Sequence, residues 1–134
     1  MANRKMKSSS SRTILIVDDE EALSHMLNDL LSGEGYKVLE ANNAARALGV
    51  LKSTHVDLMI SDIIMPGMDG FELVAKVKEL YPQVKIQLVS GYSEQIQDDN
   101  VLHKKILYKP YSQFDMIDRV KDILSSDGLD NVNQ

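Results

Sequence analysis

Two kinds of hydrophobic pattern alternate along the chain. Short runs of Val, Ile, Leu and Met are typical of strands buried on both faces, and longer segments repeat apolar residues every three or four positions, as amphipathic helices do. The runs predict five strands, at residues 13–17, 37–41, 57–61, 84–89 and 106–108. Because helical patterns follow these runs after short connections, the sequence predicts an α/β fold, a parallel sheet with helices on both faces.

Capping residues and apolar stripes mark the predicted helices. The first helix spans about 20–32, and the second spans about 43–52 and begins at an asparagine cap. The third begins at Asp69, which fits a capping box with Glu72. A weak fourth helix follows Ser93, where the residues are polar, and a last one begins at Ser112. The expected buried stripes are Leu23, Met26, Leu27, Leu30 and Leu31 in the first helix and Met116, Ile117, Val120, Ile123 and Leu124 in the last.

Length and charge narrow the class of protein. The chain has 134 residues, a net charge of −5 and no cysteine, which excludes disulfides, thiolate metal sites and cysteine nucleophiles. The negative charge argues against nucleic acid or an anionic membrane as the direct partner. No apolar run approaches the ~18 residues that a membrane span needs. We therefore expect a cytoplasmic protein.

The predicted organisation is one domain with polar ends. Residues 1–11 contain basic residues and four consecutive serines, and we expect a disordered basic leader there. An arm that binds nucleic acid or a membrane is the less favoured interpretation of this leader. Residues 12–125 are expected to form the domain and residues 126–134 a polar tail.

Three acidic residues stand where two predicted strands end. Asp62 follows the apolar run at 57–61, and Asp18 and Asp19 follow the run at 13–17. Sites of open α/β sheets lie at the carboxyl ends of their strands, and carboxylates gathered there repel one another unless a cation lies among them. Taken singly, Asp62 could cap the next turn and the Asp-Asp pair could begin a solvated helix. Together they favour a chemical site.

Four motifs at successive strand ends resemble a known family. They are Val17-Asp18-Asp19-Glu20, Asp62 with Met65-Pro66-Gly67-Met68-Asp69-Gly70, Val89-Ser90-Gly91 and Lys109-Pro110. In this order, over about residues 13–125, they resemble the response-regulator receiver domain, the phosphoaspartate module of two-component signalling. The resemblance implies a flavodoxin-like (βα)5 doubly wound sheet with strand order 2-1-3-4-5.

The resemblance also implies a role for each motif residue. Asp62 would be the nucleophile that accepts a phosphoryl group. Asp18, Asp19, Asp62 and the backbone carbonyl of Ile64 would hold Mg²⁺, or Mn²⁺ in its place, because such hard cations take oxygen ligands. Lys109 would pair with Asp62 and then with the phosphoryl group. Ser90 would donate its hydroxyl to a phosphoryl oxygen, and Gly91 would leave its N–H accessible.

The chain departs from the family's usual pattern beside the site. Receivers commonly carry an aromatic residue three positions before the lysine, and Ile106 occupies that position here. The usual switch, in which an aromatic ring turns inward, is therefore not predicted from this sequence. Ile64 and Tyr92 occupy the positions at which the family tunes the lifetime of the phosphoryl group. The Lys109–Pro110 bond is a candidate cis peptide.

Three functions compete at this stage. The leading one is a receiver that a histidine kinase or phosphotransfer protein phosphorylates and that binds a protein target through the fourth helix, fifth strand and fifth helix, as a monomer or weak homodimer. A flavodoxin-like cofactor binder is disfavoured because acidic residues fill the first βα turn. A small-molecule phosphatase with an aspartyl intermediate is disfavoured because Ile64 stands where a second acid is expected. The three histidines have no metal-ligand spacing.

Overall fold

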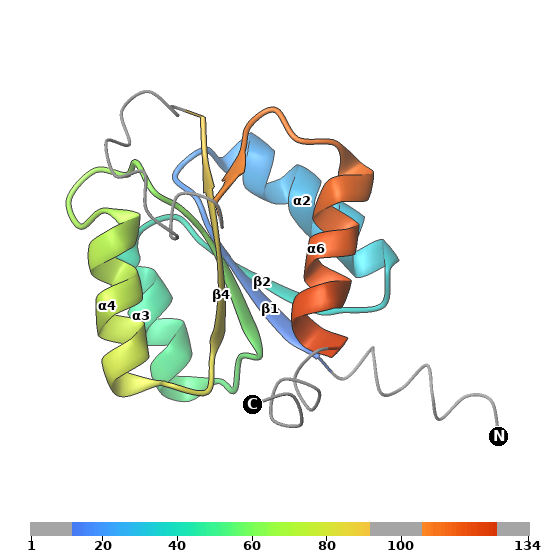
Figure 1. The fold of residues 1–134 in the computed structure, drawn as a ribbon. Helices are drawn as coiled ribbons and strands as arrows, with labels where there is room; N and C mark the ends of the chain where they lie inside the picture. The colour runs from blue at the N-terminus through green and yellow to red at the C-terminus, as the bar shows by residue number, and fades with distance from the viewer. Residues whose placement is uncertain (1–11, 92–105, 126–134) are drawn as a thin grey trace, which may run out of the picture.

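A computed structural model describes residues 12–91 and 106–125. The predicted leader, the weak helix after Ser93 and the polar tail lie outside this described part. Within it, strands and helices alternate as the hydrophobic pattern predicts (Figure 1). The elements are β1 (Thr13–Val17), α2 (Glu21–Gly33), β2 (Lys37–Ala41), α3 (Ala44–Ser53), β3 (Leu58–Asp62), α4 (Gly70–Leu80), β4 (Lys85–Ser90), β5 (Leu107–Tyr108) and α6 (Gln113–Ser125).

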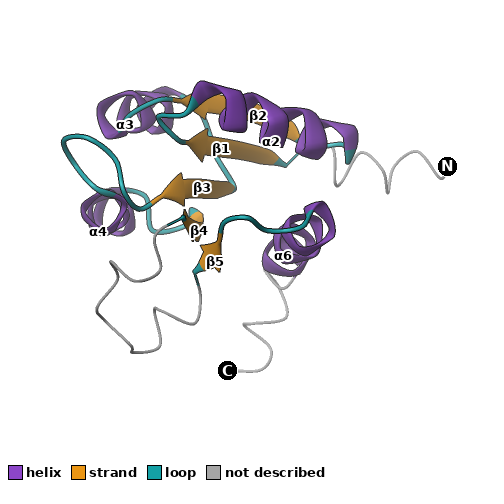
Figure 2. Ribbon diagram, turned by 90° about the horizontal axis from the view of Figure 1, so that it is seen from above, coloured by secondary structure: helices purple, strands orange, loops and turns teal. Residues whose placement is uncertain are grey.

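All strand pairs in the sheet are parallel, and the order is β2-β1-β3-β4-β5, which confirms the order that the family resemblance implies. β3 lies between β1 and β4, with Ser61 opposite Val17 of β1 and Asp62 opposite Val89 of β4. Viewed from above, α2 and α6 cover one face of the sheet and α3 and α4 the other (Figure 2). Because these strands are parallel neighbours, the carboxyl ends of β1, β3 and β4 lie at the same edge of the sheet.

The alternation of side chains along β1 divides the core into two clusters. Ile14 and Ile16 pack on the face covered by α2 and α6, whereas Leu15 and Val17 pack on the face covered by α3 and α4. All four are at most 2% exposed, and full burial of such a side chain contributes about 1.5–3 kcal/mol. The helices complete the clusters with Leu27, Leu31, Met116, Val120 and Leu124 on the first face and Ala44, Ala47, Leu51, Leu73 and Val77 on the second.

The predicted stripe of α2 is wrong in part. Leu23 is 38% exposed and Met26 is 64% exposed, whereas Leu27 and Leu31 are buried as predicted. Ser24 lies three positions before Leu27 and seven before Leu31, so it shares their face of the helix and is buried there. The hydroxyl of Ser24 donates a hydrogen bond of 2.8 Å to Glu40 of β2, so its burial leaves no polar group unsatisfied.

The predicted caps are confirmed where the chain enters its helices. Asn43 accepts a hydrogen bond from the Arg46 N–H at 2.8 Å, and Ser112 accepts one from the Asp115 N–H at 2.9 Å. Asp69 forms the predicted capping box with Glu72 at the start of α4. These caps satisfy backbone N–H groups that a helix cannot bond internally.

The first turn of α4 lies directly against the end of β3. A Cβ atom at Gly70 would be 2.5 Å from the Asp62 carbonyl oxygen and 2.7 Å from the Ile63 Cα. The N–H of Gly70 also donates to the Ile63 carbonyl at 2.7 Å. Gly67 has a φ of +79°, which favours glycine, in the loop between the two elements. The glycines of this loop therefore let the backbone after Asp62 turn back closely upon itself.

Candidate functional site

Asp62 is the last residue of β3 and lies in the middle of the sheet's carboxyl edge. Asp62 is 6% exposed, and the strands on either side of β3, which are β1 and β4, end beside it. The N–H of Ile64 forms a hydrogen bond with its carboxylate. A carboxylate in this position is nearly enclosed by the protein and is held by a backbone hydrogen bond from Ile64.

Lys109 follows β5 and reaches across the sheet edge to the acidic residues. Its Nζ lies 3.3 Å from Oδ2 of Asp62, 3.2 Å from Oδ2 of Asp18 and 3.7 Å from Oε1 of Glu20. The backbone N–H of Lys109 donates to the carbonyl of Ser90 at 2.8 Å, which fixes the strand end from which the side chain extends. One ammonium group thus contacts three carboxylates from two other segments of the chain.

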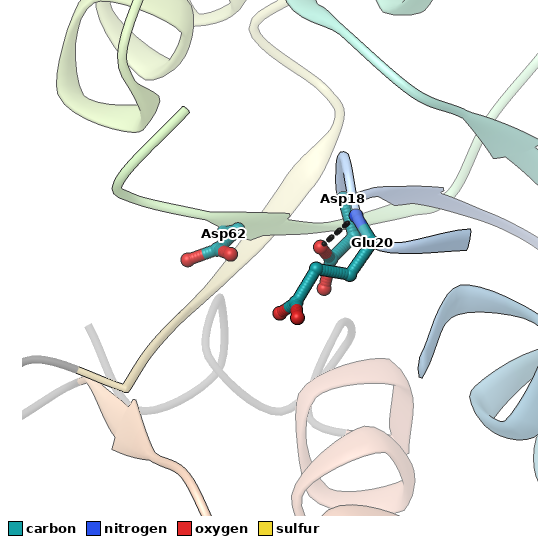
Figure 3. A group of neighbouring side chains, drawn as sticks. All are labelled: Asp18, Glu20 and Asp62. Atoms are coloured by element: carbon teal, nitrogen blue, oxygen red, sulfur yellow. Dashed lines mark hydrogen bonds between the residues drawn. The ribbon is translucent and has the colours of Figure 1, made fainter. Parts of the chain in front are cut away.

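The carboxylates themselves form a compact group. Asp18, Glu20 and Asp62 each offer an oxygen, and these oxygens all lie within 4.8 Å of one another (Figure 3). Asp18 is 7% exposed, and its Oδ1 accepts a hydrogen bond of 2.9 Å from the N–H of Glu20. A set of carboxylate oxygens at this spacing fits a hard divalent cation such as Mg²⁺, which takes oxygen ligands and retains several waters.

The surroundings of Asp62 raise the pKa of its carboxyl group above the ordinary value. Burial is the largest cause, and the neighbouring charge of Asp18 adds to it. The positive charge of Lys109 and the hydrogen bonds from Lys109 and Ile64 act in the opposite direction without reversing the shift. The positive charge of Lys109 therefore does not fully offset the cost of burying the ionised form of Asp62 beside Asp18.

Lys109 responds to the same surroundings in the opposite way. Burial alone would lower the pKa of Lys109, but the charges and hydrogen bonds of Asp18 and Asp62 raise it above the ordinary value. The pKa of Tyr111, half-buried in the α2–α6 core, is raised chiefly by burial. The lysine is thus held as a cation beside the carboxylates at neutral pH.

The other predicted site residues surround this group at different depths. Ser90 is fully buried at the end of β4, and Gly91 follows it with a would-be Cβ 3.8 Å from the Lys109 side chain. The side chain of Ile64 is exposed, and the residue is 39% exposed in all. The Lys109–Pro110 bond is cis, as predicted. The structure thus places Lys109 in contact with both Asp18 and Asp62. The roles of these three residues, like those of Ser90, Gly91 and the Ile64 carbonyl, stay predictions.

Asp19 and Ile106 do not join the contacting group. Asp19 is exposed and is not among the three carboxylates that lie within 4.8 Å. Ile106 is buried with Ile63 and Leu88 on the face of the sheet that carries α3 and α4. Tyr92 lies outside the described residues. Their predicted roles in metal binding and in tuning the switch stay predictions.

Sequence reasoning missed Glu20 and Tyr111. Glu20 was expected to begin a helix, but α2 begins at Glu21, and Glu20 occupies the N-cap position without a side-chain cap hydrogen bond. Glutamate is not a favoured N-cap residue, and that mismatch was the available signal. Tyr111 stands two positions after Lys109 and interacts electrostatically with Lys109, Asp18 and Asp62.

Comparison with known proteins agrees with this geometry. The model of the response regulator receiver domain matches residues 14–121. The chain belongs to this family. The receiver is 32% identical over 114 residues to sporulation initiation phosphotransferase F of Bacillus subtilis, with 83% of this chain and 92% of that protein covered. The receiver domain of two-component systems is therefore its fold and family.

Other relatives are longer proteins or solved receiver structures. The autoinducer 1 sensor kinase/phosphatase LuxN of Vibrio campbellii is 41% identical over 91 residues, which are 68% of this receiver but 11% of LuxN. The receiver therefore spans about a tenth of that kinase. The response regulator TrrA of Thermotoga maritima, solved in complex with Mg²⁺ and BeF, has 31% identity and a TM-score of 0.76, with 84% of this receiver and 99% of that chain covered. Among the described residues, no helix combines the length and apolar character that crossing a membrane requires.

Proposed function

We propose that this receiver accepts a phosphoryl group on Asp62 from a histidine kinase or phosphotransfer protein in a Mg²⁺-dependent reaction and thereby changes its binding to a cytoplasmic protein target. The observation that carries the proposal is the placement of Asp62: a nearly buried carboxylate at the centre of the sheet edge, 3.3 Å from Lys109 and beside Asp18. A single enclosed carboxylate with a fixed cationic neighbour suits nucleophilic attack on phosphorus.

The chemistry that this arrangement supports is an in-line displacement. An Asp62 carboxylate oxygen forms a bond to phosphorus while the bond from phosphorus to the donor's leaving atom breaks, and the leaving group departs with that electron pair. Lys109 is placed to neutralise negative charge on the phosphoryl oxygens, and we assign Ser90 the donation of a hydroxyl hydrogen bond. Mg²⁺ bound by the carboxylate oxygens would supply further charge neutralisation.

The relatives support the partner class. LuxN is named a sensor kinase/phosphatase, and the relative from Bacillus subtilis is named a phosphotransferase. TrrA was crystallised with Mg²⁺ and BeF, the latter a stand-in for a phosphoryl group, which supports both the cation and the modification for this receiver. The acidic group also argues against a cofactor phosphate at the first βα turn, since carboxylates repel it.

The experiment that tests the proposal is phosphorylation by a small donor. The full chain is incubated with acetyl phosphate and Mg²⁺, and its intact mass is measured. We expect one added phosphoryl group in the wild type, none in Asp62→Ala, and none when EDTA removes the cation. Uptake by Asp62→Ala at the wild-type level would assign the phosphoryl group to another residue.

Lys109→Ala gives a second test with a matched control. Loss of the ammonium group removes positive charge 3.3 Å from Asp62, so we expect phosphorylation to slow by at least about tenfold, equivalent to about 1.4 kcal/mol. Lys121→Ala removes the same charge from α6, where Lys121 pairs with Glu34 at 3.5 Å, and should phosphorylate at the wild-type rate. Equal rates in the two variants would remove Lys109 from the mechanism.

A further inference from the structure

The motif Val17-Asp18-Asp19-Glu20 implies a role for its two aspartates but none for Glu20. Glu20 directly precedes α2, its side chain is 63% exposed, and its carboxylate does not cap the helix. Instead, an oxygen of that carboxylate lies within 4.8 Å of oxygens of Asp18 and Asp62. The backbone N–H of Glu20 donates to Oδ1 of Asp18 at 2.9 Å, and this two-residue turn brings both carboxylates to the same edge (Figure 3). Asp19, between them, is exposed and outside the group.

The charges of the group do not balance. Asp18, Glu20 and Asp62 are three carboxylates, and Lys109 supplies one ammonium within 4.0 Å of all of them, at 3.2, 3.7 and 3.3 Å. Among these four side chains, two negative charges are left without a counter-charge. The contact between Lys109 and Glu20 is the longest of the three, and Glu20 is the most exposed carboxylate, so it is the member most free to turn toward an ion arriving from solvent.

We propose that Glu20 adds a carboxylate to the cation site, beside those of Asp18 and Asp62, and strengthens its binding of a divalent cation. The inference rests on the proposed function, because it assigns a residue to the cation that phosphorylation requires. One divalent cation carries the charge that the group lacks. Asp18 and Asp62 face the cation from within the protein, and Glu20 faces it from the solvent side, either directly or through one of the waters that Mg²⁺ retains.

The test compares cation affinity among variants of the full chain. Binding of Mg²⁺ and of Mn²⁺ is measured by calorimetry and by the rise in melting temperature with cation concentration, neither of which depends on phosphorylation. Glu20→Gln is expected to bind each ion about tenfold more weakly than the wild type, since a unit charge acts on a divalent ion at close range. Glu21→Gln removes the same charge one residue later, outside the group, and is the matched control, expected within about twofold of the wild type.

Two further variants sharpen the assignment. Glu20→Asp keeps the charge on a shorter side chain and should bind with an affinity between those of the wild type and Glu20→Gln. Asp19→Asn tests the ligand that the sequence motif implies. Equal affinities in Glu20→Gln and Glu21→Gln would overturn the inference about Glu20, whichever result Asp19→Asn gives.

The outcome separates this inference from the proposed function. A wild type that neither binds Mg²⁺ nor takes up phosphate from acetyl phosphate would refute the proposed function itself. A wild type that does both, together with a Glu20→Gln variant of unchanged affinity, would refute only the role of Glu20. All variants are first melted in EDTA, where Glu20→Gln is expected to be as stable as the wild type or more so, because it relieves repulsion among the carboxylates.

Discussion

At the scale of single residues, the buried, ionised carboxylate of Asp62 destabilises the folded state. When folding raises the pKa of a group, that group stabilises the folded state at pH values below its pKa in the unfolded chain. The stabilisation is lost as the pH rises through the pKa of the group in the folded state. Burial and Asp18 raise the pKa of Asp62 in this way. At neutral pH, where the group is ionised, it therefore makes the folded state less stable than a neutral side chain of the same shape would.

We accordingly predict that Asp62→Asn raises the melting temperature at pH 7 in EDTA. Asparagine keeps the shape of the side chain and removes the charge that burial disfavours, while Lys109 keeps Asp18 and Glu20 as partners. Thermal unfolding followed by circular dichroism is the measurement. The gain should shrink as pH falls and the wild-type carboxyl group becomes protonated. A variant that is less stable at pH 7 and gains on acidification would contradict the assigned direction of the shift.

A second residue-scale prediction concerns the turn behind Asp62. Gly70→Ala forces a methyl group to within 2.5 Å of the Asp62 carbonyl oxygen, so the start of α4 or the end of β3 must move. We expect a loss of about 1–3 kcal/mol in the free energy of unfolding, as for other overpacked sites, together with slower phosphorylation.

Gly49→Ala is the control for that substitution. Gly49 lies inside α3, is exposed, and has no atom within 4 Å of a would-be Cβ. Alanine there should stabilise the protein by about 0.5–1 kcal/mol, because it reduces the freedom of the unfolded chain and favours the helix. Urea denaturation of both variants measures the contrast. Equal effects at the two positions would show that the close approach at Gly70 does not constrain the fold.

At the scale of elements, Glu40 joins α2 to the edge strand β2. Its carboxylate accepts hydrogen bonds from Ser24 at 2.8 Å and Asn28 at 2.7 Å and contacts Nδ1 of His25 at 2.8 Å. Burial alone would raise the pKa of Glu40, but the hydrogen bonds of these three residues lower it below 4.5. The hydrogen bond to Glu40 and its charge raise the pKa of His25 above 6.5. Contacts from two adjacent turns of α2 therefore converge on a single side chain of β2.

We predict a pH window for this junction. Glu40 stabilises the fold above pH 4.5 and loses that contribution as pH falls through its lowered pKa, and His25 stabilises it below pH 6.5 and loses that contribution as pH rises through its raised pKa. The coupling between the two residues should be greatest between about pH 4.5 and 6.5. A double-mutant cycle with His25→Gln and Glu40→Gln, melted from pH 5 to 8.5, measures it. A coupling that stays constant over this range would contradict the shifts.

At the scale of the whole molecule, Lys109 connects the reacting edge to β5 and α6. We predict that BeF with Mg²⁺ changes amide hydrogen exchange in β5 and α6 more than in α3. Lys109 follows β5 and contacts Asp62, whereas α3 contributes no residue to the group of Asp18, Glu20, Asp62 and Lys109. The predicted target surface also includes the predicted helix after Ser93, which is not α4 and lies outside the described residues. In the control variant Asp62→Ala, no peptide should change. Equal changes in α3 and α6, or none in α6, would remove this face from the proposal.

How much of this molecule the sequence predicts depends on which interactions decide each feature. The strands follow from apolar runs, because strands covered on both faces leave few polar positions. The capping box at Asp69 depends on local sequence alone. Strand order came only through the family resemblance, since neighbours in a sheet are not encoded in periodicity. The burial of Ser24 on the face of α2 that packs on the sheet is accompanied by a hydrogen bond to a distant partner, Glu40, which local periodicity does not reveal. The contact of Glu20 with the site depends on the turn geometry after β1, which residue type alone does not specify.

The two borders of the sheet bear on how this protein behaves in a crowded solution. An outermost strand offers unpaired backbone groups to any other extended chain, which is a route to aggregation. At one border β5 pairs over two residues only, and at the other β2 carries the charged residues Lys37 and Glu40, the latter held by α2. Within the described residues, neither border presents a long, apolar strand. The short pairing of β5 and the charged residues of β2 therefore disfavour the addition of strands from foreign chains without enclosing the sheet in a barrel.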